Sequence, residues 1–203
     1  MTLPPPPAAL PPRPRLYEVA EGDLLVRFYN PLHGGWDARR SFGPLPGIRF
    51  DHHRPPPGSG VDRSVWYAAT SLLGAVAEAF GNRGFIDRGS GRRICVARVR
   101  EPIEVLDMVG AAPRAFGLDQ RIATSLEYER CQEWARALYE GYPDFRGFRW
   151  RGRQAGSICF VLNDRTDMSA LEAIIDRDLG DPEIWARIAR AARRCHIRIV
   201  SPW

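Results

Sequence analysis

The chain has 203 residues, and its 44% hydrophobic and 26% charged content is ordinary for a soluble globular protein. Its formal net charge is +5, and all 29 basic residues are arginine. No stretch has the apolar length of a membrane span, and the first residues lack the basic-then-apolar order of a signal peptide. We therefore expect a cytoplasmic protein that does not engage a membrane.

The first residues have a composition of their own. Seven prolines fall between residues 4 and 14, which is typical of a polyproline-like or flexible arm. We predict that residues 1–15 form such an arm outside the fold. Residues 16–203 are long enough to form one domain with a sizeable core.

From residue 16 onward, short apolar runs are interspersed with helical patterns. Residues 30–64 are rich in Gly, Pro and His and are predicted to form one long loop, which in a compact domain is often functional. Strands are predicted at residues 24–29, 65–69, 92–100, 103–106, 145–150, 158–162 and 196–200. Helices are predicted at residues 71–81, 120–140, 168–178 and 182–194. The mixed order favours an α+β domain over a doubly wound sheet.

The cysteines and histidines do not form a metal-binding pattern. The four cysteines are far apart, without a C-x-x-C spacing, and the only adjacent histidines are His52 and His53. We expect reduced core thiols, exposed loop histidines and no bound metal. A glycine-rich dinucleotide fingerprint and a P-loop are both absent from the sequence.

The predicted helix at residues 71–81 carries a carboxylate in an unusual setting. Its apolar stripe contains Leu72, Leu73, Val76, Ala77 and Phe80. Glu78 lies on the other flank, above the small residues Ser71, Gly74 and Ala75. A carboxylate above such small neighbours has open space for a ligand, although the solvent face of an amphipathic helix would have the same pattern.

Several segments occur in an order that resembles the RES domain family. They are Arg27-Phe28 on a strand, Gly47-Ile48-Arg49-Phe50 in the loop, Tyr67-Ala68, Glu78, the run from Tyr128 to Tyr139, and Gly147-Phe148-Arg149-Trp150. The resemblance covers residues 16–162. It implies a single domain with the mixed sheet and flanking helices of ADP-ribosyltransferases. It also implies a toxin that consumes NAD as its substrate and is neutralised by an Xre-type antitoxin.

The resemblance assigns roles to individual residues. Glu78 matches the family's helical glutamate, which would stabilise the positive charge that develops on the ribose when the nicotinamide bond breaks. Arg27, with Phe28 beside it, and Arg49 would bind NAD, because guanidinium pairs with phosphate oxygens in a bidentate manner. Tyr67 would stack on a ring or bond a ribose hydroxyl.

The family's serine has no direct match. Gly152 stands where the family pattern places it, two residues after Trp150. Ser157, five residues further on, is predicted to take the catalytic role from the same turn, and Ser125 is a second candidate.

Other functions stay open beside degradation of NAD by hydrolysis or phosphorolysis. The chain could transfer ADP-ribose to a protein, or it could be an inactive binding module, a reading that Gly152 supports. Arginines at helical spacing, including Arg187, Arg190, Arg193 and Arg194, could meet nucleic acid. Because no helix-turn-helix or RRM signature accompanies them, we do not expect direct nucleic-acid binding. The chain could form a homodimer, and the 30–64 loop is a plausible rim for antitoxin docking.

Overall fold

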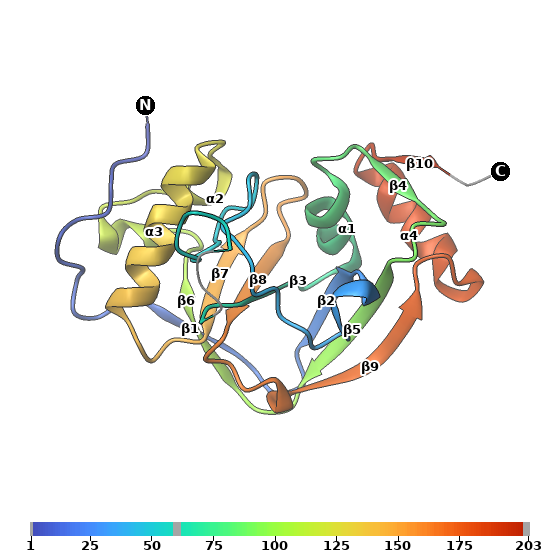
Figure 1. Ribbon diagram of the computed structural model, residues 1–203, viewed down its shortest axis with the longest axis horizontal. Helices are drawn as coiled ribbons and strands as arrows, with labels where there is room; N and C mark the ends of the chain where they lie inside the picture. The colour runs from blue at the N-terminus through green and yellow to red at the C-terminus, as the bar shows by residue number, and fades with distance from the viewer. Residues whose placement is uncertain (1, 59–61, 201–203) are drawn as a thin grey trace.

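The computed structural model describes residues 2–58 and 62–200. These residues form an α+β domain around one strongly curved, eight-stranded mixed sheet (Figure 1). In spatial order its strands are β1 (Leu16–Val19), β6 (Ile103–Asp107), β7 (Gly147–Arg151), β8 (Ile158–Asn163), β3 (Val65–Ala69), β2 (Leu24–Tyr29), β5 (Arg93–Val99) and β9 (Leu171–Asp178). Within this sheet β6 and β7 are parallel and the other neighbouring pairs are antiparallel. The predicted α+β class with a mixed sheet is confirmed.

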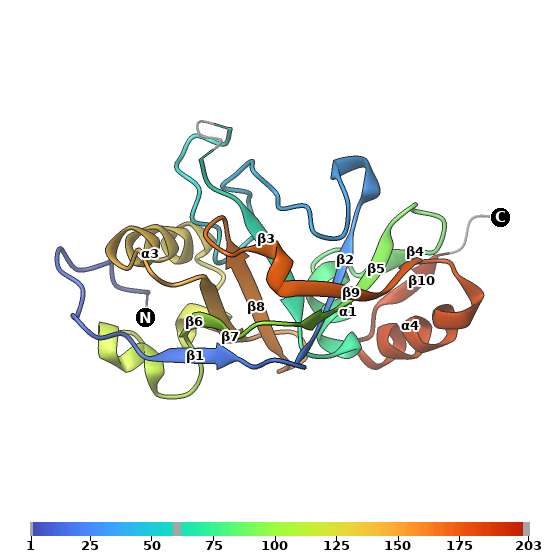
Figure 2. The same ribbon diagram turned by 90° about the horizontal axis from the view of Figure 1, so that it is seen from below.

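The helices flank the two ends of the curved sheet. The α-helices of the described residues are α1 (Leu72–Phe80), α2 (Arg121–Thr124), α3 (Tyr128–Gly141) and α4 (Pro182–Arg194). A parallel pair, β4 (Phe85–Asp87) and β10 (Arg198–Val200), lies beside α4. Figures 1 and 2 show α2 and α3 at one end of the molecule and α1 and α4 at the other, with the 30–64 loop between them.

Side-chain alternation along β3 builds two cores, one on each face of the sheet. Val65 and Ala69 join the core that also contains buried residues of α1, α3 and α4. Trp66 and Ala68 point the other way and join a second core, with Leu25 of β2 and Phe160 of β8. A strand buried on both faces reads as a continuous apolar run, which is why the sequence predicts it.

Helix α1 begins with a side-chain cap at Ser71. The Ser71 hydroxyl accepts a hydrogen bond from the Gly74 backbone N–H at 3.1 Å, and so satisfies one free donor of the first turn. Gly74 then lets the helix approach the turn between β7 and β8 closely. A Cβ at Gly74 would lie 2.5 Å from the Ser157 Cβ. The absence of that atom fixes the depth at which α1 lies over the sheet.

The predicted helix at residues 168–178 is wrong. Residues 168–170 form a short 3₁₀ helix, and Leu171–Asp178 is the edge strand β9, antiparallel to β5. The acidic residues that look helical in sequence pair across the strands instead: Arg93 bonds Asp176 at 3.0 Å and Asp178 at 2.8 Å. The free edge of β5 overrides a weak local helix preference.

Smaller differences concern element ends. The predicted helix at residues 120–140 is two helices, α2 and α3. The short strands β1 and β4 lie in segments for which the sequence analysis predicts no element. The remaining predicted strands and helices occur within a few residues of their expected bounds. In the described residues no helix is long and apolar enough to cross a bilayer.

The Pro-rich segment lies against α3 rather than free in solution. Leu3 is 3% exposed, the Trp134 indole donates to the Pro4 carbonyl at 2.7 Å, and the Tyr142 hydroxyl donates to the Pro11 carbonyl at 2.6 Å. An extended proline-rich chain leaves its carbonyls unpaired, and these α3 side chains satisfy two of them.

The two adjacent histidines are buried, contrary to the expectation of exposed loop residues. His52 stacks on Tyr139 of α3 at 4.2 Å between ring centroids and lies 3.3 Å from an Asp164 carboxylate oxygen. His53 bonds the buried Asp51. The stacking of His52 on Tyr139 attaches the long loop to α3, whereas the bond between His53 and Asp51 lies within the loop itself.

Candidate functional site

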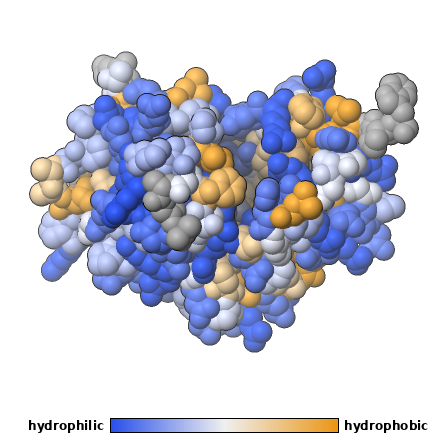
Figure 3. Space-filling model, viewed as in Figure 1, coloured by the Kyte–Doolittle hydropathy of each residue, from blue (hydrophilic) through white to orange (hydrophobic). Residues whose placement is uncertain are grey.

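A cavity of about 700 Å³ opens between the 30–64 loop, α1 and the middle of the sheet. Its volume is within the range of about 300–1,000 Å³ that is usual for small-molecule sites. The space-filling view has a hollow in the middle of the corresponding face (Figure 3). Seven arginines and a single carboxylate, that of Glu78, belong to the described wall. An anionic ligand therefore suits this cavity.

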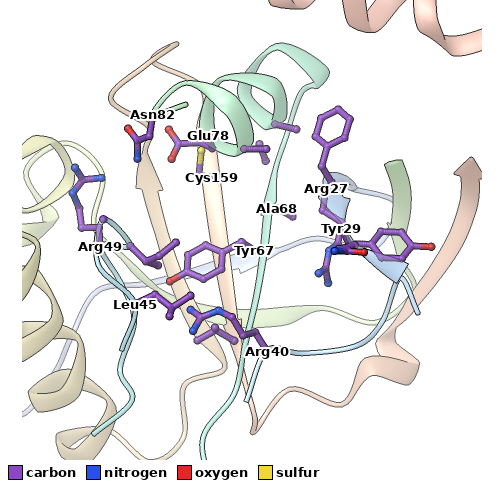
Figure 4. A pocket seen from close by; sticks show the side chains of 18 of the residues that line it. Arg27, Tyr29, Arg40, Leu45, Arg49, Tyr67, Ala68, Glu78, Asn82 and Cys159 are labelled. Carbon is purple, nitrogen blue, oxygen red and sulfur yellow. The ribbon is translucent and has the colours of Figure 1, made fainter. Parts of the chain in front are cut away.

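Glu78 points from α1 into the cavity (Figure 4). Its side chain is exposed to the cavity rather than packed in the core. Desolvation by the surrounding protein raises its pKa from an ordinary value of 4.5, while the charges of Arg49 and Arg153 oppose that rise. The carboxylate is thus close to two cations but forms no ion pair with any described residue. It is free to contact a ligand.

Gly152 provides the space in which the Glu78 carboxylate lies. A Cβ at Gly152 would be 2.5 Å from Glu78 Oε1 and 3.0 Å from the Cys159 sulfur. The position that the family resemblance assigns to a serine is therefore beside Glu78 in space. In this chain the missing side chain leaves the carboxylate room to reach its position.

Tyr67 of β3 also points into the cavity (Figure 4). Its hydroxyl oxygen is buried and has no hydrogen-bond partner among the described residues. Burial raises the pKa of this phenol well above its ordinary value, so it is a neutral donor near pH 7. A buried hydroxyl without a partner is rare, because leaving it unsatisfied costs about 1–3 kcal/mol, and it indicates a site for a polar ligand atom.

Arg49 reaches the cavity from the 30–64 loop and is 8% exposed. One Nη2–H donates to the Ser125 carbonyl at 2.7 Å, and the guanidinium lies over the Tyr128 ring, 5.2 Å from its centroid. The Nε–H is buried without a partner in the part of the chain that the structure describes. Arg49 is thus fixed in place with a donor still unused.

Arg27 and Phe28 are adjacent on β2 and have different contacts. Phe28 packs edge-on against Phe80 of α1, with centroids 5.1 Å apart, and both Arg27 and Phe28 border the cavity. Arg27 Nη1 donates to the Trp36 carbonyl at 3.0 Å and to the Ala38 carbonyl at 3.2 Å. Its guanidinium also lies over Trp66, in the core on the opposite face of the sheet, and burial lowers its pKa to about 10. These contacts bind the 30–64 loop to the sheet, and a phosphate role for Arg27 stays a prediction.

Neither candidate serine is part of the cavity wall. The Ser157 hydroxyl lies 3.2 Å from that of Ser71, the residue that caps α1. Ser125 supplies its carbonyl to Arg49 and its hydroxyl to the Glu127 N–H. The catalytic role predicted for Ser157 stays a prediction, and its contacts indicate that it positions the start of α1.

The cavity wall also contains residues that the sequence analysis does not assign to the site. Asn82 follows Glu78 by four residues and so shares its helical direction, a signal that the sequence does contain. Trp150, Cys159 and the cations Arg83, Arg92 and Arg153 come from separate elements, and nothing in the linear sequence brings them together. Burial and then the charge of the nearby Glu78 raise the pKa of the Cys159 thiol, which disfavours its thiolate form.

The described residues contain no group of three or more His, Cys, Asp or Glu side chains arranged to hold a metal ion.

Comparisons with known proteins give one family match and one match of fold. Residues 17–185 match the family described as RES domain. The fold is similar to a chain in the crystal structure of the M. tuberculosis MbcT-MbcA toxin-antitoxin complex, with a TM-score of 0.59 and 18% sequence identity, over 85% of this chain and 92% of that one. At this identity the likeness is one of fold. A search of curated proteins found no match.

Proposed function

The chain belongs to the RES domain family, and from this premise we propose that it is the toxin of a toxin–antitoxin pair that degrades NAD by cleaving its nicotinamide–ribose bond. The structural neighbour is named as a toxin–antitoxin complex, which supports the first part of the proposal. The second part depends on one observation above all. Glu78 and Tyr67, whose buried hydroxyl has no partner among the described residues, both line a cavity whose described wall also contains seven arginines.

The proposed chemistry follows from the charges in this cavity. When the bond between the nicotinamide nitrogen and C1′ of the ribose breaks, the electron pair leaves with nicotinamide and the ribose becomes oxocarbenium-like. A fixed carboxylate beside the ribose stabilises that positive charge. Glu78 suits this role because its carboxylate lies in an incompletely solvated site and forms no ion pair with a described residue.

Two neighbours would position the dinucleotide. The Tyr67 hydroxyl would donate to a ribose or carboxamide oxygen and so gain the partner that it lacks in the free protein. Arg49 has an unused Nε–H and a guanidinium already oriented by Tyr128, which suits a phosphate oxygen. Both groups are ordered before substrate arrives, which lowers the entropy cost of binding.

The reaction ends when an oxygen nucleophile forms a new bond at C1′ of the ribose. Water would give ADP-ribose, nicotinamide and one proton, and inorganic phosphate would give a phosphorylated ADP-ribose instead. A protein side chain as acceptor would make the chain an ADP-ribosyltransferase.

The decisive experiment is incubation of purified protein with NAD, with and without inorganic phosphate, followed by identification of the products by mass spectrometry. We expect free nicotinamide and one ADP-ribose product. The matched control is Glu78→Gln, which keeps size and hydrogen bonding but removes the charge. Intact NAD after prolonged incubation with folded wild-type protein would overturn the proposal and favour an inactive binding module.

An antitoxin, proposed to be of the Xre type, would cover the mouth of this cavity. The 30–64 loop supplies much of the rim and exposes two apolar side chains, Leu32 at 86% and Phe42 at 45%. Exposed apolar residues at a rim are typical of a surface that a partner covers. We expect that expression of the chain alone arrests growth and lowers cellular NAD, and that co-expression of the partner restores both.

A further inference from the structure

The arginines of the cavity wall differ in what they contact. Four of them are held by the protein itself. Arg27 and Arg49 donate to backbone carbonyls, Arg39 donates to the Thr166 carbonyl, and Arg40 pairs with the buried Asp51 at 2.7 Å. Three others, Arg83, Arg92 and Arg153, have neither a hydrogen bond nor an ion pair from their side chains to any described residue.

These three cations lie around the C-terminal end of α1. Arg83 is in the turn that follows the helix, and Arg92 immediately precedes β5. Arg153 lies in the turn between β7 and β8, which contacts the same end of α1 through a hydrogen bond of 3.3 Å from Gln154 to Asn82. One end of the cavity therefore has three unpaired guanidinium groups within its wall.

Of these three cations, Arg83 acts electrostatically on Arg92. The Arg92 guanidinium lies over the buried ring of Phe80, 5.6 Å from its centroid, and is half-buried. Its pKa is lowered first by burial and then by the positive charge of Arg83, and no carboxylate opposes this shift. Two cations that repel each other beside a cavity are stabilised when an anion binds between them.

We propose that Arg83 and Arg92 form a phosphate-binding subsite at the α1 end of the cavity, separate from the position of Arg49. Phosphate is the anion that best suits two guanidinium groups, because each can donate two parallel hydrogen bonds to its oxygens. The charge of Arg153 instead acts on Glu78, where it opposes the rise of the carboxyl pKa. The phosphate group would come from the bound dinucleotide or from free inorganic phosphate.

The test measures binding rather than turnover, so that it does not depend on the proposed reaction. Isothermal titration of the full chain would use ADP-ribose, inorganic phosphate and adenosine as probes. The variant is Arg83→Gln with Arg92→Gln. The control is Arg187→Gln with Arg190→Gln, which removes the same charge from two exposed positions on α4 outside the cavity wall. Circular dichroism and thermal melting would establish that both variants are folded.

We expect the Arg83/Arg92 variant to bind at least one phosphate probe about 10–100-fold more weakly than wild type, because two charge-assisted hydrogen-bonding groups are lost. The α4 control and the affinity for adenosine should stay unchanged. A loss confined to ADP-ribose would identify the substrate's own phosphates as the ligand, and a loss for inorganic phosphate would identify free phosphate.

Three results would overturn the subsite. The first is equal affinity of wild type and the Arg83/Arg92 variant for both phosphate probes, and the second is an equal loss in the α4 control. The absence of any phosphate binding to wild type would overturn it as well. Failure of the proposed function is distinguishable, because it would appear as intact NAD in a wild type that still binds these probes.

Discussion

Gly152→Ala tests whether the position of the Glu78 carboxylate controls the reaction. The new Cβ would lie 2.5 Å from Glu78 Oε1, whereas ordinary contacts begin at 3.4 Å. Gly152 directly follows β7, and its backbone is held by hydrogen bonds to Ser157 and Gly156, whereas the Glu78 carboxylate is the end of a flexible side chain. The carboxylate must therefore move by about 0.9 Å to reach an ordinary contact distance. A displacement of roughly 1 Å at a reacting group can lower the rate about 10²-fold.

The assay is steady-state NAD turnover, with thermal melting as a measure of folding. We expect kcat to fall about 10²-fold in a protein that still folds, with a small decrease in melting temperature. Glu78 can give way at the cavity surface, and the buried Cys159 sulfur, 3.0 Å from the new Cβ, must shift by only a few tenths of an ångström. Ala155→Ser is the matched control, since it enlarges a side chain in the same turn at a residue outside the cavity wall. Gly152→Ser should lose activity for the same steric reason as Gly152→Ala.

Two outcomes would refute this reasoning. Wild-type kcat in a folded Gly152→Ala protein would mean that Glu78 does not act from its observed position. Higher activity in Gly152→Ser than in wild type would mean that the serine implied by the family pattern is the missing catalytic group, and that the glycine impairs the site instead of accommodating Glu78.

Further predictions concern charge at the same site and beneath it. Glu78→Gln should lower NAD turnover about 10²–10³-fold in a folded protein. Wild-type turnover should fall with decreasing pH through a pKa above 4.5, because only the ionised Glu78 carboxylate is effective. Arg49→Lys should raise the KM for NAD more than it lowers kcat, since lysine keeps the charge but not the fork; an unchanged KM would place the phosphates elsewhere. In urea titrations across pH, stability should fall below pH 6.5, because burial lowers the pKa of His52 and the unfolded chain then binds the proton more readily. A further loss should follow from pH 3.8 towards 2 as Asp51 is protonated, its folded pKa being about 2; flat stability from pH 8 to 5 would contradict the His52 assignment.

The sequence predicts those strands and helices whose formation depends mainly on residues close together in the chain. Val65–Ala69 is apolar throughout because the strand is buried on both faces, and Ser71 caps α1 because its hydroxyl can reach an N–H three residues on. Leu171–Asp178 misled the prediction because its charges suit a helix as well as an edge strand, and only the open edge of β5 decides between them. His52 misled it because burial depends on Tyr139 and Asp164, which are distant in sequence.

The contacts of the arginines also depend on residues distant in sequence. These contacts determine which guanidinium groups are available to a ligand. A sequence with 29 arginines and no lysine gives no indication of which guanidinium groups are free. Arg27 matches the family pattern, yet its donors are directed to the Trp36 and Ala38 carbonyls, so its charge holds the loop that forms the cavity wall. Arg83 and Arg92 match no pattern and have no counterion among the described residues. Because a charge already paired by the protein adds little to ligand affinity, the unpaired arginines are those from which anion binding should be expected.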